Sequence, residues 1–312
     1  MKYFLPLAGS VLTVTLAASP VMWAQAAPPP YVREGKTMKV SEHVWVIPDG
    51  RVNLVPNIGF IVGSKATLVV DSGMGDRNGQ VVLGELRKVS KSADLYLTTT
   101  HFHPEHVTGF HVFPAGAKLI RPTLQQQELP AKGPGMIANF SRMSAAHAEL
   151  LKGAVMRPAD IVFDSSVEID LGGVTARLFT LGPAHTKGDN FIWVKEDNVL
   201  FGGDVITNRF FPILPDADSN GKNWISILDQ LAALRPRTIV PGHGEVDSID
   251  IIARQRGILQ ALQLRARKVK SEGASAEDAA RILSEEFRAR YPEYESPGML
   301  GNGVRKFYAE AP

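Results

Sequence analysis

Short apolar runs that end in glycine, proline or polar residues recur along most of the chain. Such runs, bounded by turn residues, are typical of β-strands. The pattern predicts strands over residues 44–47, 58–63, 67–71, 95–100, 167–171, 175–181, 190–194, 198–201 and 238–244. Apolar residues three or four apart fall on one face of a helix, and this spacing predicts helices instead. It occurs over residues 78–89, 123–152, 224–234 and 251–291.

The predicted elements form two series with one plan: hairpin strands, a helix, then a strand that ends in a histidine. This repetition predicts two ββα halves that pack sheet to sheet with helices outside. The helical insertion over residues 123–152 interrupts the strands, and its Met and Phe residues form either core or the roof of a pocket. Near the C-terminus, Ser275 and Asp278 have the spacing of a capping box and predict a helix over residues 279–290.

A cluster of histidines follows the predicted strand at residues 95–100. His101, His103, Glu105 and His106 fall within six residues, although the whole chain has only eight histidines. Alternate residues of an extended segment point to the same side, so His101 and His103 can reach one ion. Imidazole and carboxylate suit zinc, iron and similar metals. The cluster therefore predicts a metal site rather than a histidine-rich surface loop.

Three more candidate ligands lie downstream, each just after an apolar strand and flanked by glycine or proline: His185, Asp204 and His243. Glycine beside Asp204 and His243 lets the backbone turn tightly, so that the side chain faces a metal. Asp71 ends an earlier strand in the same way. The loop that it opens, residues 71–75, is either a helix-capping turn or a place from which the Asp71 carboxylate orients a ligand histidine from outside the ligand set.

In order and context, these residues resemble the ligand series of the metallo-β-lactamase superfamily. The resemblance covers roughly residues 41 to 260, and the loop at Asp71 is similar to the superfamily's first motif. It implies an α+β fold, a four-layer αββα sandwich, with a dinuclear site that usually holds zinc. It also implies a first ion on His101, His103 and His185, a second on Glu105, His106 and His243, and Asp204 between them. Glu105 stands where an aspartate is usual, so occupancy of the second site stays open.

The resemblance implies a hydrolase in which water activated by two Zn²⁺ ions attacks an ester, thioester, lactone or lactam. Asp204 and Glu105 are then the candidate catalytic residues, as proton relays. Aspartate at position 204 is similar to the thioesterase, lactonase and sulfatase branches, whereas zinc β-lactamases usually carry cysteine or serine there. A true β-lactamase remains an alternative, as do a mononuclear iron dioxygenase and a metal-binding module without activity.

Composition narrows the function further. The chain of 312 residues has no cysteine, so no disulfide supports the fold and no thiolate binds the metal. Its net charge of +2 gives no argument for nucleic acid. We expect a small-molecule acyl substrate, in a pocket shaped by residues 53–56 and 208–212. Within the second segment, Arg209 holds a substrate carboxylate or pairs with a nearby acid. The oligomeric state stays open.

The first residues have the layout of a secretory leader. Lys2 precedes an apolar stretch over residues 4–18, and Ala24-Gln25-Ala26 gives the small-x-small pattern of a cleavage site. We therefore expect a cleaved leader over residues 1–26 and no stable membrane anchor afterwards. The protein would be exported, to the periplasm if the source is a diderm bacterium. We expect a loosely held lead-in over 27–40, a catalytic domain over 41–260, and a helical extension over 261–312 that packs on it.

Overall fold

The computed structural model describes Met1, residues 28–215 and residues 217–312. Apart from Met1, the expected leader lies outside the described residues. Within the described part of the chain, no helix combines the length and apolar character needed to cross a membrane.

Two mixed sheets form the centre of the molecule. The first has seven strands in sequence order: β1 (Met38–Lys39), β2 (Val44–Ile47), β3 (Ile58–Val62), β4 (Thr67–Val70), β5 (Leu95–Thr98), β6 (Lys118–Pro122) and β7 (Ile161–Phe163). The second has five: β8 (Ser166–Asp170), β9 (Thr175–Phe179), β10 (Phe191–Val194), β11 (Val199–Gly203) and β12 (Thr238–Pro241). Each sheet starts with antiparallel pairs and changes to parallel pairing at β4–β5 or β11–β12.

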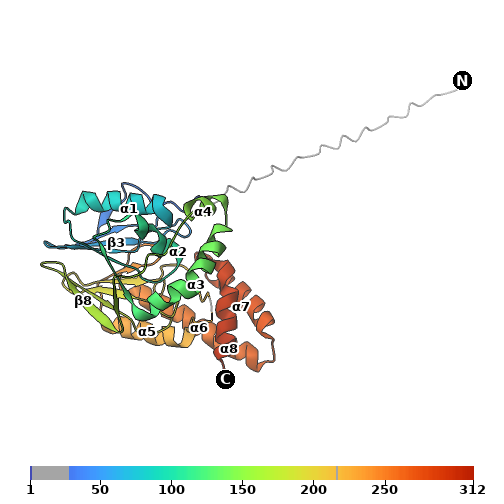
Figure 1. Cartoon of the computed structure of the whole chain (residues 1–312). Coiled ribbons are helices and arrows are strands. Elements are labelled where there is room, and N and C mark those ends of the chain that lie inside the picture. The colour runs from blue at the N-terminus through green and yellow to red at the C-terminus, as the bar shows by residue number, and fades with distance from the viewer. Residues whose placement is uncertain (2–27, 216) are drawn as a thin grey trace.

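Apolar side chains alternate along the strands and give each sheet two buried faces. In β4, Leu68 and Val70 belong to the core between the sheets, whereas Val69 belongs to the core under α1 (Gly75–Val89). The second sheet packs in the same way against α5 (Gly221–Ala233) and α6 (Asp250–Ser271). Figure 1 shows the layers in order, with α1 above β3 and with α5 and α6 beyond β8. The predicted four-layer αββα sandwich is confirmed.

Shorter elements link the layers. The loop after β5 contains α2 (Pro104–Val107) and a 3₁₀-helix, η1 (Thr108–Val112). The predicted helical insertion is two helices, α3 (Thr123–Ser141) and α4 (Ala145–Leu150), and it packs on Met74 through Phe140, Leu150 and Leu151.

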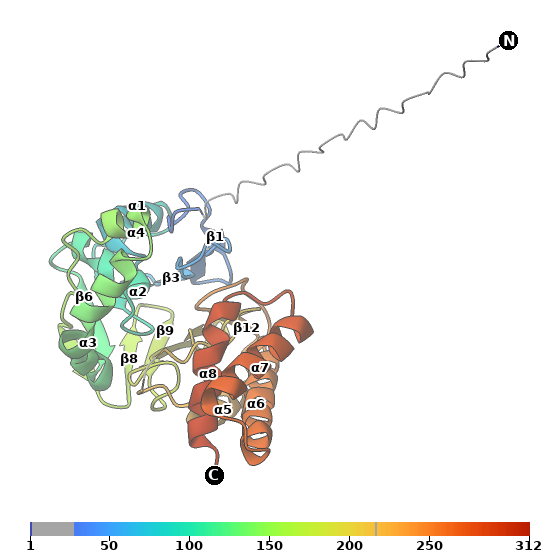
Figure 2. The same cartoon turned by 90° about the vertical axis from the view of Figure 1, so that its right-hand side faces the viewer.

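The C-terminal helices share one core with the second sheet. After α6 come α7 (Ala276–Arg290), the 3₁₀-helix η2 (Pro297–Met299) and α8 (Leu300–Glu310). Figure 2 shows α7 and α8 beside α6, and α8 also contacts α5. Ser275 caps α7 by accepting a hydrogen bond from the backbone N–H of Asp278, as the capping box predicted. The helix α6 is continuous across residues 260 and 261, where we expected the catalytic domain to end and the helical extension to begin.

The lead-in docks on α1, although we expected it to be loosely held. The backbone N–H of Val32 donates to Asn78 Oδ1 at 3.0 Å, and Asn78 Nδ2 donates to the Pro30 carbonyl at 2.8 Å. Val32 itself is buried. The side chain of Asn78 thus provides hydrogen-bond partners for the Val32 N–H and the Pro30 carbonyl, and it fixes the Pro-rich lead-in on α1.

Candidate metal centre

Seven buried side chains meet at the edge of the sandwich where β5, β9, β11 and β12 end. The loop after β5, which enters α2, carries four of them: His101, His103, Glu105 and His106. The others follow the strands of the second sheet: His185 after β9, Asp204 directly after β11 and His243 after β12. None of the seven is more than 7% exposed. All the site residues that the sequence predicted are therefore close together.

In a first group, ring nitrogens of His101, His103 and His185 face one another. His101 Nε2 lies 3.0 Å from His103 Nδ1, and His185 Nε2 lies 3.3 Å from the same atom. Ligands placed tetrahedrally at a zinc–nitrogen distance of about 2.0–2.1 Å lie about 3.3 Å from one another. The spacing of these nitrogens therefore fits a single small cation.

A second group consists of Glu105, His106 and His243, whose ligand atoms lie within 4.8 Å of one another. Asp204 stands between the groups. Its Oδ2 is 3.7 Å from His185 Nε2, and its Oδ1 is 3.7 Å from His106 Nε2 and 3.6 Å from His243 Nε2. Asp204 therefore presents one carboxylate oxygen to each group.

The residues pass a test of fit for metal ions. Two buried atoms of the second group, Glu105 Oε2 and His106 Nε2, have no hydrogen-bond partner, and neither has Asp204 Oδ1. A buried polar atom without a partner costs about 1–3 kcal/mol, so native proteins rarely keep several together. A cation held by these atoms would remove that cost, and all three belong to residue types that bind zinc.

A sequence profile of the metallo-β-lactamase superfamily matches residues 51–243, which is more than half of the chain. The chain belongs to this superfamily. A type 2 metallo-β-lactamase of Bacteroides fragilis is 24% identical to it, over 66% of this chain and 76% of its own length. The resemblance seen in the ligand series is thereby confirmed.

Solved structures agree on the fold. A metallo-β-lactamase from Pontibacter korlensis superposes with a TM-score of 0.58 at 17% identity, over 72% of this chain and 98% of that one. A stereoselective inverting sec-alkylsulfatase from Pseudomonas sp. superposes with a TM-score of 0.65 at 14% identity, over 88% of this chain and 50% of that one. At such identities the likeness shows the metallo-β-lactamase fold and leaves the substrate open.

Glu105, where the superfamily usually has aspartate, keeps its carboxylate inside the cluster. Its Oε1 lies 3.9 Å from His106 Nε2, and its side chain is 3% exposed. The additional methylene therefore does not remove the side chain from the second group.

Asp71 orients one of the candidate ligands. Its Oδ2 lies 2.9 Å from His106 Nδ1, and its Oδ1 accepts a hydrogen bond from the Thr100 N–H at 2.8 Å. This contact leaves His106 Nε2 facing the cluster, as in the carboxylate–histidine–metal arrangement. The loop over residues 71–75 also leads directly into α1, whose N-cap is Met74, but no side chain caps that helix.

Backbone carbonyls orient two histidines of the second half. His185 Nδ1 lies 2.7 Å from the carbonyl of Ile213, and His243 Nδ1 lies 3.0 Å from that of Val55. In both rings, a proton on Nδ1 that is donated to the carbonyl leaves Nε2 as the nitrogen that can bind a metal.

The electrostatics of the site separate the histidines into two kinds. Burial and the neighbouring histidines hold the pKa values of His101 and His103 well below the usual value, so both rings are neutral and able to bind metal. Burial also lowers the pKa of His106, but the Asp71 carboxylate outweighs it and raises that pKa to about 9.

The pKa values of the two acids in the cluster are shifted in opposite directions. Burial raises the pKa of Glu105 to about 7, only partly opposed by His106. Burial also tends to raise the pKa of Asp204, but the surrounding histidines, His243 first, lower it to about 2. Asp204 is therefore the acid that stays ionised in this environment.

Several buried polar residues support the metal loops without having been predicted from the sequence. Asp189 accepts a hydrogen bond from the backbone N–H of His185 at 2.8 Å. The carbonyl of Thr99 accepts from Asn190 Nδ2 at 3.0 Å and from Gln125 Nε2 at 3.2 Å. Asp189 could have been suspected because it stands four residues after a candidate ligand. Gln125 gives no such signal, since its partners are distant in sequence.

The remaining histidines lie outside the cluster. His43 pairs with Asp197 at 2.7 Å, and His147 pairs with the hydroxyl of Ser144 at 2.8 Å. The side chain of His111 is 58% exposed and lies near Asp76, so it is not a neighbour of the site.

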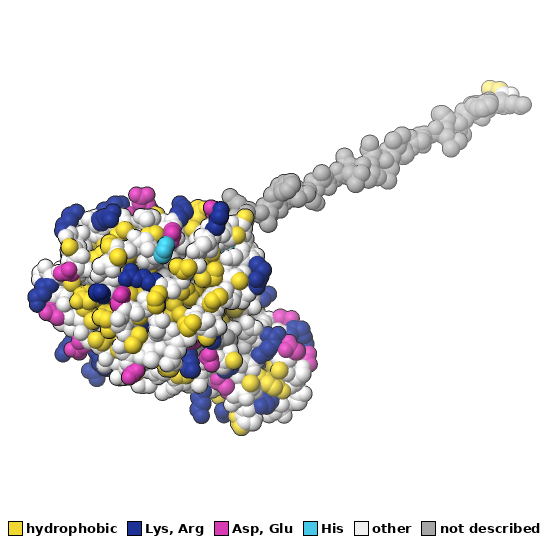
Figure 3. Space-filling model, in the orientation of Figure 1, with side chains coloured by type: hydrophobic (Ala, Val, Ile, Leu, Met, Phe, Trp, Pro, Cys, Tyr) yellow, Lys and Arg dark blue, Asp and Glu magenta, His cyan; other side chains and the backbone are white. Residues whose placement is uncertain are grey.

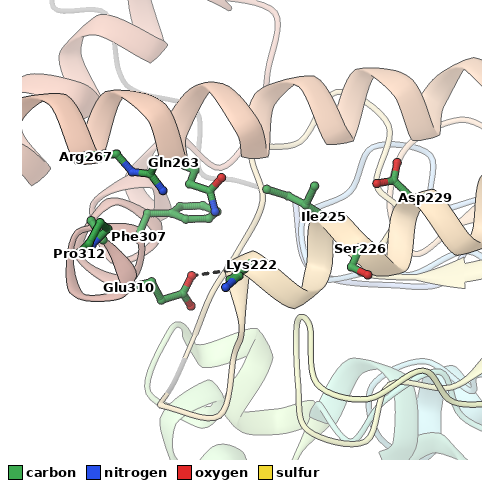
Figure 4. A pocket seen from close by; sticks show the side chains of 10 residues that line it. Lys222, Ile225, Ser226, Asp229, Gln263, Arg267, Phe307, Glu310 and Pro312 are labelled. Atoms are coloured by element: carbon green, nitrogen blue, oxygen red, sulfur yellow. Dashed lines mark hydrogen bonds between the residues drawn. The ribbon is translucent and has the colours of Figure 1, made fainter.

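A cavity of about 670 Å³ lies against the cluster and is lined by five of its members: His103, Glu105, His185, Asp204 and His243. A second cavity of about 590 Å³ lies between α5, α6 and α8 (Figure 4). Its lining residues include Lys222, Asp229 and Arg267 but no member of the cluster. The first cavity is therefore the candidate substrate pocket.

Proposed function

We propose that the protein is a zinc-dependent hydrolase that cleaves an ester, thioester, lactone or lactam in a small exported or periplasmic substrate. The observation that carries the proposal is the convergence of two groups of donors, joined by Asp204, on one wall of a cavity. A donor set of imidazole and carboxylate without thiolate suits Zn²⁺ in a site that also admits water.

The chain's residues have distinct roles in this proposal. One ion would be held by His101, His103 and His185, and a second by Glu105, His106 and His243. When bound, the ions supply an activated water and polarise the carbonyl oxygen. Asp204 holds its two oxygens toward the two groups, and Asp204 and Glu105 both line the cavity. Either carboxylate is therefore placed to pass a proton to the leaving group.

A β-lactam ring is the second candidate substrate. It is favoured by the similarity to the type 2 metallo-β-lactamase of Bacteroides fragilis. Against it, the described residues that line the cavity include no lysine or arginine that would pair with the carboxylate of such antibiotics.

Metal content measured together with a substrate panel tests the proposal. The purified protein should contain about two zinc ions and should hydrolyse simple aryl esters, thioesters or lactones. Cleavage of a chromogenic cephalosporin at a comparable rate would favour the β-lactamase instead. A single iron with oxygen consumption would favour the dioxygenase, and a loaded protein that turns over nothing would leave only a metal-binding module.

A further inference from the structure

The walls of the cavity over the cluster are mostly apolar and come from four separate segments. Helix α3 and the turn after it contribute Met136, Phe140 and Met143, and the loop before β3 contributes Leu54. The segment after Asp204 contributes Phe210, Ile213 and Pro215. The fourth wall is η2 with the segment before it, and it contributes Tyr294, Pro297 and Met299.

The described residues of the walls offer no cationic side chain to a negative charge. Apart from members of the cluster, the charged side chain among the described lining residues is Glu295, which is itself an anion. Glu295 already pairs with Arg51 at 3.1 Å. Arg209, which we considered as a partner for a substrate carboxylate, is exposed and does not line the cavity. A substrate carboxylate against these walls would lose water and could gain hydrogen bonds from Asn53, Tyr294 or Ser296, but it would gain no ionic partner from the described wall residues.

The C-terminal wall is fixed to the loop after Asp204. The Glu295 N–H donates to the Arg209 carbonyl at 2.9 Å, and the Phe211 N–H donates to the Glu295 carbonyl at 3.1 Å. The rings of Phe211 and Tyr294 pack with centroids 5.3 Å apart. Hydrogen bonds and ring packing therefore hold this wall against the loop that follows the candidate ligand Asp204.

Three of the wall residues are methionines: Met136, Met143 and Met299. Methionine is flexible and polarizable, so it adapts to apolar groups of different shape. Met143 is 54% exposed. Figure 3 shows apolar side chains gathered on the face of the molecule where α3 lies in Figure 1.

We infer that the site takes substrates whose part away from the reacting bond is an uncharged hydrocarbon group, and that Met299 is a specificity-determining residue. This inference rests on the proposed hydrolase function and names its substrate class. The cluster would hold the reacting bond, while the hydrocarbon group packs against α3 on one side and the C-terminal segment on the other.

A matched pair of esters tests the inference on the zinc-loaded protein. p-Nitrophenyl hexanoate and the mono-p-nitrophenyl ester of adipic acid have chains of equal length, but the second ends in a carboxylate. We expect at least a tenfold higher kcat/KM for the hexanoate. From acetate to octanoate, kcat/KM should rise about three- to fourfold for each methylene that the walls bury.

Met299→Lys should place a cation in the wall. The ratio of kcat/KM for the hexanoate to kcat/KM for the adipate ester should then fall by at least tenfold. Met299→Ala should lower kcat/KM for octanoate more than for acetate. Met38→Lys is the control, because Met38 is an exposed methionine on β1 and does not line the cavity. It should change none of these ratios.

Binding gives a readout that needs no turnover. Calorimetric titration with 2-octanone, a neutral ketone that is not hydrolysed, should show at least tenfold weaker binding to Met299→Lys than to the unchanged chain or to Met38→Lys. Absence of turnover for every ester, thioester, lactone and lactam tested would overturn the proposed hydrolase, while binding of the ketone still tests the wall. Ester turnover that ignores chain length or prefers the adipate ester would overturn the inference alone.

Discussion

The two halves of the sandwich contribute to the candidate site in different ways. The first half supplies four of the seven residues from one continuous loop, between His101 and His106. The second half supplies the other three from loops after three different strands. A local pattern in sequence therefore reveals the first set, whereas the second set comes together only because the strands of one sheet end at a common edge.

The halves also differ in how the histidines are held. In the first half, the side chain of Asp71 orients His106, and a substitution can remove it. In the second half, carbonyls of Ile213 and Val55 orient His185 and His243, and no side-chain substitution removes them. A substitution can therefore change the orientation of His106 in the first half, whereas the orientation of His185 and His243 in the second half depends on the backbone.

The largest effect is expected from His103→Ala, which removes the nitrogen that both His101 and His185 face. Loss of a proposed ligand should exceed the ten- to hundredfold loss typical of residues that only orient ligands, so activity should fall by more than about a hundredfold. Metal content should fall by about one ion per chain. His111→Ala, at an exposed histidine outside the cluster, should behave like the unchanged protein. Full activity in His103→Ala would show that the first group does not hold the catalytic metal.

A smaller and more selective effect is expected from Asp71→Asn. Asparagine tolerates the left-handed backbone at this position, where φ is 64°, and its amide oxygen can still accept from Thr100. The charge that orients His106 is lost, so affinity for the second ion should fall about ten- to hundredfold.

Competition with a graded chelator would measure this effect, with Asp76→Asn as the control at an exposed aspartate. An equal loss of affinity for both ions would show that Asp71 does not act on the second group alone. It would also show that the two halves do not differ in how their histidines are held.

Asn57 joins the halves, and its substitution should lower stability. Its Nδ2 donates to the carbonyls of Pro241 and Gly244 at 2.9 and 2.7 Å, on either side of His243. Asn57→Ala would leave buried carbonyls with fewer partners, which should lower the free energy of unfolding by about 2 kcal/mol. Denaturant titration measures the change, with the exposed Asn302→Ala expected within about 0.5 kcal/mol of the unchanged chain. An unchanged midpoint for Asn57→Ala would mean that the halves do not depend on this contact.

Much of the fold could be predicted because its signals are local. The strands around β3 and β4, the helix α1 and the capped helix α7 all follow from apolar spacing and turn residues. The short strands β6 and β7 were not predicted, and α8 was expected only as part of the helical extension over residues 261–312, without bounds of its own. The edge strand β7 has exposed residues at Ile161 and Val162, so burial does not impose a period on it. Helix α8 contains two glycines, Gly301 and Gly303, which weaken a helical signal.

The site could be predicted only in part, for a similar reason. Ligand positions follow from strand ends, but their supports do not. The partners of Asn57 and Gln125, and the wall formed by Tyr294 and Met299, depend on contacts between segments far apart in the chain. A single sequence carries no signal for such contacts until the topology is known.

The smallest expected effect concerns the lead-in, which closes the outer face of the first half as the C-terminal helices close the second. Glu85 on α1 accepts hydrogen bonds from the Gly35 N–H, at 2.8 Å, and from the hydroxyl of Thr37. Burial tends to raise the pKa of Glu85, but its hydrogen bonds, that from Lys88 first, hold the pKa below the usual 4.5. Because the folded pKa is lowered, the stabilisation is present above about pH 4.5 and is lost as the pH falls through the folded value.

Glu85→Gln should therefore lower the free energy of unfolding by about 1 kcal/mol at pH 7. The difference from the unchanged chain should shrink as the pH is lowered from 7 toward 3, because Glu85 becomes protonated as the pH falls through its lowered pKa. Denaturant titrations at the two pH values measure it, with the exposed Glu34→Gln as the control. A difference that stays constant with pH would mean that the charge of Glu85 does not hold the lead-in. The lead-in would then be retained by Asn78 and the burial of Val32, and its attachment would resemble the largely apolar packing of the C-terminal helices.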